Sequence, residues 1–153
     1  MTSVYDIVRK VKDTLYAHPI VNTVTFGDIT QIDLSKTTIF PLTHFTVSST
    51  EVGSSHLSFN LSFIFMDIVD YTKTYVEDIE DRDDGTNLLD ILNTQLQIAN
   101  EFISSLRRGT LHTEGYHLEG EPVCRMFKDK YENQLAGWRV DLTIMVRNNI
   151  SVC

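Results

Sequence analysis

The sequence predicts an α+β fold, in which a four- to five-stranded antiparallel sheet carries two helices packed on one face. One observation is that apolar and polar side chains alternate along 42–69 and 133–148, as they do in strands with one buried face. A second is that apolar residues recur at steps of three and four along 3–17 and 88–108, as they do in amphipathic helices. Runs of strands separated by single helices are typical of layered α+β domains.

The first helix is predicted over residues 3–17 from its capping residues and its apolar spacing. Ser3 is a suitable N-cap, and Asp6 stands where the partner of a capping box is expected. Pro19 ends the helix because a proline disfavours the helical conformation of the residue before it. The apolar face would be formed by Val4, Ile7, Val8, Val11 and Leu15.

Three strands are expected next. A short one ends at a turn formed by Gly27 and Asp28, a second covers about 42–51, and a long third follows the turn "GSSH". Burying five side chains of the third strand at roughly 2 kcal/mol each gives about 10 kcal/mol of gross driving force, so we place the hairpin 42–69 at the sheet's centre. These five are Leu57, Phe59, Leu61, Phe63 and Phe65.

The opposite face of this third strand also becomes apolar beyond residue 63, at Ile64, Met66 and Ile68. A strand that is apolar on both faces needs cover on both faces. Either a loop or helix of the same chain or a neighbouring subunit would supply that cover.

The segment 71–86 is expected to be a solvated acidic loop or an arm. Like charges at this density repel one another and disfavour packing into a core. Together with Ile64, Met66 and Ile68, its acidic residues are our candidates for contact with a partner. They are Glu77, Asp78, Glu80, Asp81, Asp83 and Asp84.

The second helix, 88–108, is predicted to start at a cap formed by Thr86 or Asn87 and to stop at Gly109. Its apolar stripe consists of Leu88, Leu92, Gln95, Ala99, Phe102 and Leu106, widened by Leu89, Leu96 and Ile103. After an irregular stretch, "LHTEGYHLEGEP", a strand is expected at about 121–128. The closing strand has one face formed by Trp138, Val140, Leu142, Ile144 and Val146.

Composition fits one domain spanning 1–153. The net charge is −8 and the pI is near 4.9, so the surface repels phosphate backbones and general nucleic-acid binding is disfavoured. The cysteines, Cys124 and Cys153, lack metal or redox spacing, which favours a reducing compartment. The N-terminus lacks the apolar core of a signal peptide, and no apolar run approaches a membrane span.

Candidate chemistry is sparse, and we expect neither an enzyme nor a cofactor. An EF-hand aligned on Gly85 would put Arg82 and Ile91 at ligand positions, which defeats it. His117 and Glu119 match part of a zinc-deaminase motif, but its paired cysteines are missing. No motif for a serine nucleophile or for phosphate binding occurs. A metal site is conceivable in the loop from His112 to Glu121, through His112, Glu114, His117 and Glu119.

The order of these segments resembles the tail-terminator-like group of neck and tail-completion proteins in tailed bacteriophages. The segments that carry the resemblance are "YAHPIVNTVTFGDI", "FPLTHFTV", "LSFNLSFIFMD", the acidic break, "NLLDILNTQLQIANEFISSL" and "LAGWRVDLTIMVRN". Together they cover nearly the whole chain.

This resemblance implies a structural virion protein, assembled in the host cytoplasm, that joins head to tail or terminates the tail tube. Such proteins form closed rings, hexamers or in some necks dodecamers, between portal, neck or tail neighbours. DNA would pass through the ring without specific binding, and no membrane is involved. Ring contacts are heterologous, so one surface of a copy meets a different surface of the next. The acidic segment would then be an arm that reaches a neighbour or a lining of the channel.

Two other functions stay open. One is a small metal-binding or enzymatic α+β domain that uses the His112–Glu121 loop. The other is a host-encoded adaptor that binds partners through the acidic loop.

Overall fold

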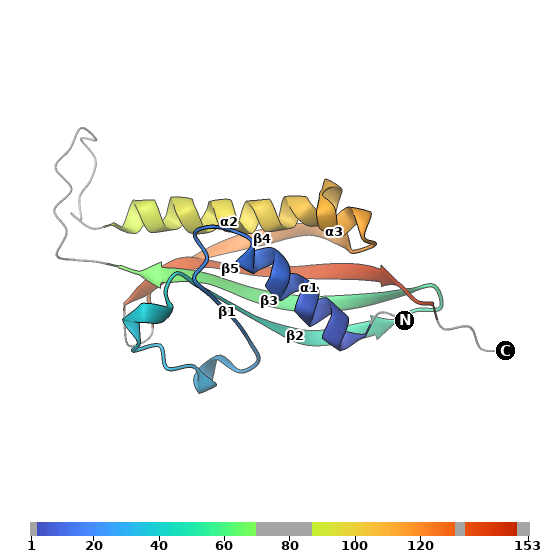
Figure 1. The fold of residues 1–153 in the computed structure, drawn as a ribbon, viewed down its shortest axis with the longest axis horizontal. Coiled ribbons are helices and arrows are strands. Elements are labelled where there is room, and N and C mark those ends of the chain that lie inside the picture. Colours follow the sequence, from blue (N-terminus) through green and yellow to red (C-terminus); the bar gives the residue numbers. More distant parts are fainter. Residues whose placement is uncertain (1–2, 70–86, 131–133, 150–153) are drawn as a thin grey trace.

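The computed structural model describes residues 3–69, 87–130 and 134–149, and it confirms the α+β class. Two long helices cover one face of a five-stranded sheet (Figure 1). The helices are α1 (Val4–Tyr16), α2 (Leu88–Arg108) and the short α3 (Thr110–Thr113). The strands are β1 (Thr23–Phe26), β2 (Leu42–Val52), β3 (His56–Ile68), β4 (His117–Lys130) and β5 (Leu135–Arg147).

The strands lie in the order β1-β2-β3-β5-β4, so β1 and β4 form the two edges of the sheet. The expectation of a fully antiparallel sheet was wrong for one pair, because β1 runs parallel to β2 while the other neighbours are antiparallel. Parallel neighbours need a long connection. Residues 27–41 supply it through two 3-10 turns, η1 (Ile29–Gln31) and η2 (Thr37–Ile39).

His44 ties this connection to the sheet. Its Nε2 lies 2.8 Å from the carbonyl oxygen of Gly27, so Nε2 donates that hydrogen bond, and its Nδ1 accepts from the Thr25 hydroxyl at 2.8 Å. The side chain is 3% exposed. Burial lowers the pKa of the imidazole, so the neutral form is favoured in the folded protein.

The predicted capping box of α1 is confirmed. The Ser3 hydroxyl accepts from the Asp6 backbone N–H at 3.2 Å, and the Asp6 carboxylate accepts from the Ser3 N–H at 2.9 Å. These bonds lower the pKa of Asp6. The sheet-facing side of α1 is Ile7, Val11 and Leu15, whereas Val4, expected on the same face, is 52% exposed.

The main core lies between the helices and the inner face of β2, β3 and β5. Phe45, Phe63 and Phe65 stack across it, with ring centroids 5.5 and 5.9 Å apart, and Phe102 from α2 packs on Phe63 at 5.1 Å. All four side chains are almost completely buried. This layer accounts for the apolar face that the alternation in β3 predicts.

The apolar strip on the opposite face of β3 is covered by the same chain. Met66 is fully buried in a second cluster, and Ile64 and Ile68 pack against that cluster. Its other members come largely from the connection between β1 and β2, including Leu34 and Phe40. Of the two expected kinds of cover, the structure therefore has a loop of the same chain.

The C-terminal half departs from the prediction in where β4 begins. The stretch expected to be irregular forms α3 and the start of β4, which begins at His117 rather than near 121. Glu119 pairs with Thr143 but Val123 pairs with Asp141, so β4 bulges there by two extra residues. Gly120 within the bulge has a φ of +73°, which a glycine adopts without strain.

The predicted helix α2 is confirmed, with Asn87 in the N-cap position. The indole N–H of Trp138 donates to the carbonyl oxygen of Leu92 at 2.8 Å, which fixes α2 over β5. Gln95 faces the core and is 1% exposed. No helix of the described residues has the length and apolar character that spanning a membrane requires.

Candidate functional site

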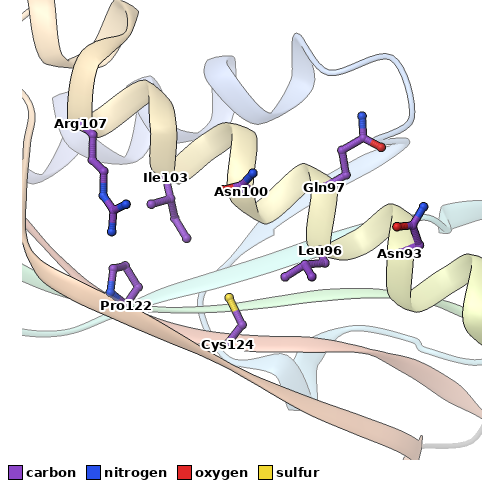
Figure 2. Close-up of a pocket in the computed structure, with 8 residues that line it drawn as sticks. All are labelled: Asn93, Leu96, Gln97, Asn100, Ile103, Arg107, Pro122 and Cys124. Atoms are coloured by element: carbon purple, nitrogen blue, oxygen red, sulfur yellow. The ribbon is translucent and has the colours of Figure 1, made fainter.

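A groove of about 580 Å³ runs between α2 and the edge strand β4 (Figure 2). In Figure 2, Leu96 and Ile103 point from the helix toward the β4 side, where Cys124 faces them. Amide side chains and one guanidinium complete the α2 wall. The lining residues are Asn93, Leu96, Gln97, Asn100, Ile103, Arg107, Pro122 and Cys124.

The groove has the chemistry of a recognition surface. Burial raises the pKa of the Cys124 thiol, which disfavours the thiolate that a nucleophilic cysteine needs. The amides offer donors and acceptors, Leu96 and Ile103 offer apolar contact, and Arg107 adds a planar cation at one end. Such a lining suits an uncharged group with an apolar body and a polar tip.

The exposed large apolar side chains fall into two sets, one on elements near β1 and one on α2 and β4. Five large ones belong to α1, β1 or the turn between them: Val4, Tyr5, Tyr16, Ile20 and Phe26. Four belong to α2 or β4: Leu89, Leu96, Val123 and Met126. Since α1 packs beside β1 while α2 packs on β3, β4 and β5, these two sets follow the two edges of the sheet. Among the described residues, the one exposed large apolar side chain outside these two sets is Val52, at the β2–β3 turn.

The first half of edge strand β4 has features that disfavour pairing with a strand from another molecule. The bulge around Gly120 interrupts the regular spacing of backbone groups, and Pro122 has no N–H to donate. Exposed charged residues, including Glu121 and Arg125, follow the same edge. A partner at this side therefore meets side chains in the groove more readily than a free backbone ladder.

On the sheet face opposite the helices, the part that the β1–β2 connection does not cover is polar. Its side chains form hydrogen bonds with one another. Ser62 donates to Asp141 at 2.5 Å, Thr143 donates to the Asn60 side-chain oxygen at 2.6 Å, and Ser58 donates to Glu119 at 3.2 Å. These bonds satisfy polar groups across β3, β4 and β5, so this face needs no second layer.

The structure brings together two of the four side chains considered for a metal. The Nδ1 atoms of His112 and His117 lie 3.0 Å apart, with the rings edge to face at 4.4 Å between centroids. Glu114 instead pairs with Lys10 of α1, and Glu119 accepts from Ser58 on the outer face. Among the described residues, no group of three or more histidine, cysteine, aspartate or glutamate side chains is placed to hold a metal ion.

The predicted contact residues are only partly placed. Met66 has no exposed surface, and Ile64 and Ile68 are half-buried beneath the β1–β2 connection. The six acidic residues, from Glu77 to Asp84, lie outside the described part of the chain.

Sequence reasoning did not predict the groove, although one signal pointed to it. The apolar stripe of α2 is too wide for a helix with one buried face, because Leu89, Leu96 and Ile103 repeat at every seventh position beside it. The structure leaves Leu89 54% and Leu96 39% exposed, and Leu96 and Ile103 line the groove.

Comparison of the sequence with protein-family models and with curated proteins found no match.

Proposed function

We propose that this protein is a structural subunit of a tailed-bacteriophage virion, which forms a ring in the neck or tail and takes no part in catalysis. The order of sequence segments resembles the tail-terminator-like group, and the fold is of the expected α+β class. Ring formation places each copy against two neighbours, through two different surfaces.

The observation that carries this proposal is the division of the exposed apolar residues between the two sheet edges. Large exposed side chains such as Tyr5 on one side and Met126 on the other are 82% and 57% exposed. Head-to-tail contact needs two different surfaces on each copy, and the exposed apolar residues supply candidates at both sheet edges. Aromatic residues and methionine are also the types that protein interfaces favour.

The test is the mass of the purified full-length chain in solution. Light scattering coupled to size exclusion is expected to report a closed oligomer of fixed copy number, and negative-stain images are expected to display rings. A chain that stays monomeric at all concentrations, alone and with the portal-side partner, contradicts the proposal. The surrounding genes give an independent check, since portal, capsid and tail genes are expected beside this one.

A second candidate, a small metal-binding domain, is favoured by the contact between His112 and His117. The two Nδ1 atoms lie 3.0 Å apart, and the Nδ1 of His112 is also 3.2 Å from the Leu106 carbonyl oxygen. A transition-metal ion bound by both nitrogens would replace these hydrogen bonds and take its remaining ligands from elsewhere. Metal analysis after incubation with Zn²⁺ tests it. Stoichiometric zinc that disappears in His112→Ala and His117→Ala supports a metal site, and metal-free wild-type protein rejects it.

A further inference from the structure

We infer that Arg125 of β4 and Arg139 of β5 bind the acidic segment 77–84 of a neighbouring copy. This inference rests on the proposed function, because it names a surface through which one subunit of the ring would contact the next. The occupant to which it commits is that segment, supplied by a second copy of this chain.

The two arginines lie side by side on the sheet face opposite the helices. Cys124 points toward α2 in Figure 2, and successive side chains of a strand point to opposite faces, so Arg125 points away from α2. Arg125 and Arg139 are register partners, and such partners have Cβ atoms about 4.5–5.5 Å apart. Both residues are exposed, and the Arg125 side chain is 73% exposed.

Little negative charge lies close enough to balance this pair. The carboxylate of Asp141 is 4.0 Å from the Arg125 guanidinium, and it also accepts a hydrogen bond from Ser62 at 2.5 Å. Within the described part of the chain, the Arg139 guanidinium has neither an ion pair nor a hydrogen bond. Like charges directly opposite each other destabilise a sheet. Local arrangements that cost stability are typical of functional sites, and here the missing component is an anion.

The chemistry of the pair selects carboxylates on a peptide. Each guanidinium presents a planar fork of N–H donors, which fits a carboxylate through two parallel hydrogen bonds. Side chains two residues apart in an extended peptide point to the same side, about 7 Å from each other, so one peptide can reach both forks. Val123, on the same face beside Arg125, is 63% exposed and offers apolar contact. The net charge of −8 disfavours a phosphate backbone as the anion.

The segment 77–84 has the composition that such a surface binds. Six of its eight residues are acidic, and acidic residues two positions apart occur twice, at Asp78 and Glu80 and at Asp81 and Asp83. Ile79 adds one apolar side chain. The segment is therefore complementary in charge to the arginine pair and has an apolar residue to place against Val123.

The length of the chain around this segment allows it to reach another copy. Residues 70–86 connect Val69 to Asn87, and a chain extends by about 3.3–3.6 Å per residue, so a loop that leaves and returns reaches roughly 25–30 Å. Val69 packs in one cluster with Ile91 of α2, so both ends of this stretch lie on the helix side of the sheet. The arginines lie on the opposite face. A copy would have to wrap the segment around its own sheet to reach them, whereas a neighbouring copy avoids that path.

The experiment changes the two partners separately. Arg125→Glu and Arg139→Glu each reverse one charge of the receiving surface. Both also remove the like-charge contact, so these variants are expected to be at least as stable as the wild type in urea denaturation. A segment variant replaces every Asp and Glu of 77–84 by its amide. Arg147→Glu is the matched control, because Arg147 is another exposed arginine on the same face of β5.

Light scattering over a series of concentrations measures assembly. Arg125→Glu, Arg139→Glu and the segment variant are each expected to raise the concentration at half-assembly by about tenfold or more, since charge-assisted hydrogen bonds are lost. Arg147→Glu is expected to stay within about twofold. An equimolar mixture of Arg139→Glu and the segment variant is expected to form heterodimers in native mass spectrometry at a concentration where each alone is monomeric, because each supplies the partner that the other lacks.

The outcomes separate this inference from the proposed function. Rings that form equally well in all three variants overturn the contact and leave the ring itself intact. Rings weakened by the arginine variants but not by the segment variant overturn the segment as the occupant. A mixture without heterodimers overturns the neighbouring copy as its source. Binding of a double-stranded DNA oligonucleotide that Arg139→Glu abolishes would assign the pair to phosphates instead. A wild-type chain that is monomeric overturns both the inference and the proposed function.

Discussion

Replacing Gln95 by methionine is expected to stabilise the protein. Gln95 is 1% exposed on the core side of α2, and neither atom of its side-chain amide bonds to a described atom. A buried amide without partners loses its hydrogen bonds to water and gains none in return. Methionine has nearly the same length and flexibility and needs no partner.

The magnitude follows from the two unpaired atoms. A buried donor or acceptor that is left unsatisfied costs about 1–3 kcal/mol. Helix propensity contributes little to the difference, because glutamine and methionine are similar helix formers. We therefore expect the free energy of unfolding to rise by about 1–3 kcal/mol, which corresponds to a Tm increase of roughly 2–12 °C for a chain of this length.

Urea denaturation and thermal scans of both proteins, at the same concentration, measure this change. Gln97→Met is the matched control, because the same substitution then falls on an exposed position of the same helix. Its effect is expected to stay within about 0.5 kcal/mol. If Gln95→Met destabilises the protein, or has no more effect than Gln97→Met, the amide is paired in solution and the reasoning is refuted.

Three further predictions concern the fold. Gly137→Ala is expected to lower the free energy of unfolding by about 3 kcal/mol or more in urea denaturation, because the added Cβ would lie 1.8 Å from the Phe65 carbonyl oxygen in the central strand. Gly115→Ala meets no atom within 4 Å and is expected to cost less, because only the strain of its φ of +96° opposes it. Because burial lowers the pKa of His44, the unfolded chain binds more protons below about pH 6.5. Stability should thus be constant above that pH and fall as the pH drops toward the folded pKa, and His44→Asn should remove this slope. Ser3→Ala should lower the free energy of unfolding by about 1 kcal/mol and reduce helical circular dichroism.

The elements that the sequence predicted well depend on neighbours close in the chain. The capping box of α1 needs only Ser3 and Asp6, and the alternation in β3 and β5 directly reflects one buried face. The stacked phenylalanines of the core follow from the same alternation. Local periodicity was therefore sufficient to predict the class of the fold and its central hairpin.

The elements that the sequence predicted poorly depend on contacts between residues far apart in the chain. The direction of β1 depends on the path of residues 27–41. This connection covers the apolar strip of Ile64, Met66 and Ile68 instead of forming a simple hairpin. The start of β4 was hidden because the bulge at Gly120 interrupts the alternation on which strand prediction relies. The groove was missed for a related reason, since helix periodicity identifies an apolar face without telling which part of it the sheet leaves uncovered.

The two sheet edges are unequal in a way that bears on how copies could join. β1 has four residues and β4 has fourteen, so an edge-to-edge ladder between them could form only a few backbone bonds. A ladder that slipped in register would also give no unique angle between copies. A head-to-tail chain closes at a fixed copy number only if the angle between neighbouring copies is constant. The bulge and Pro122 disfavour open-ended strand pairing at β4, so under the proposed function the contacts between copies would be made by side chains.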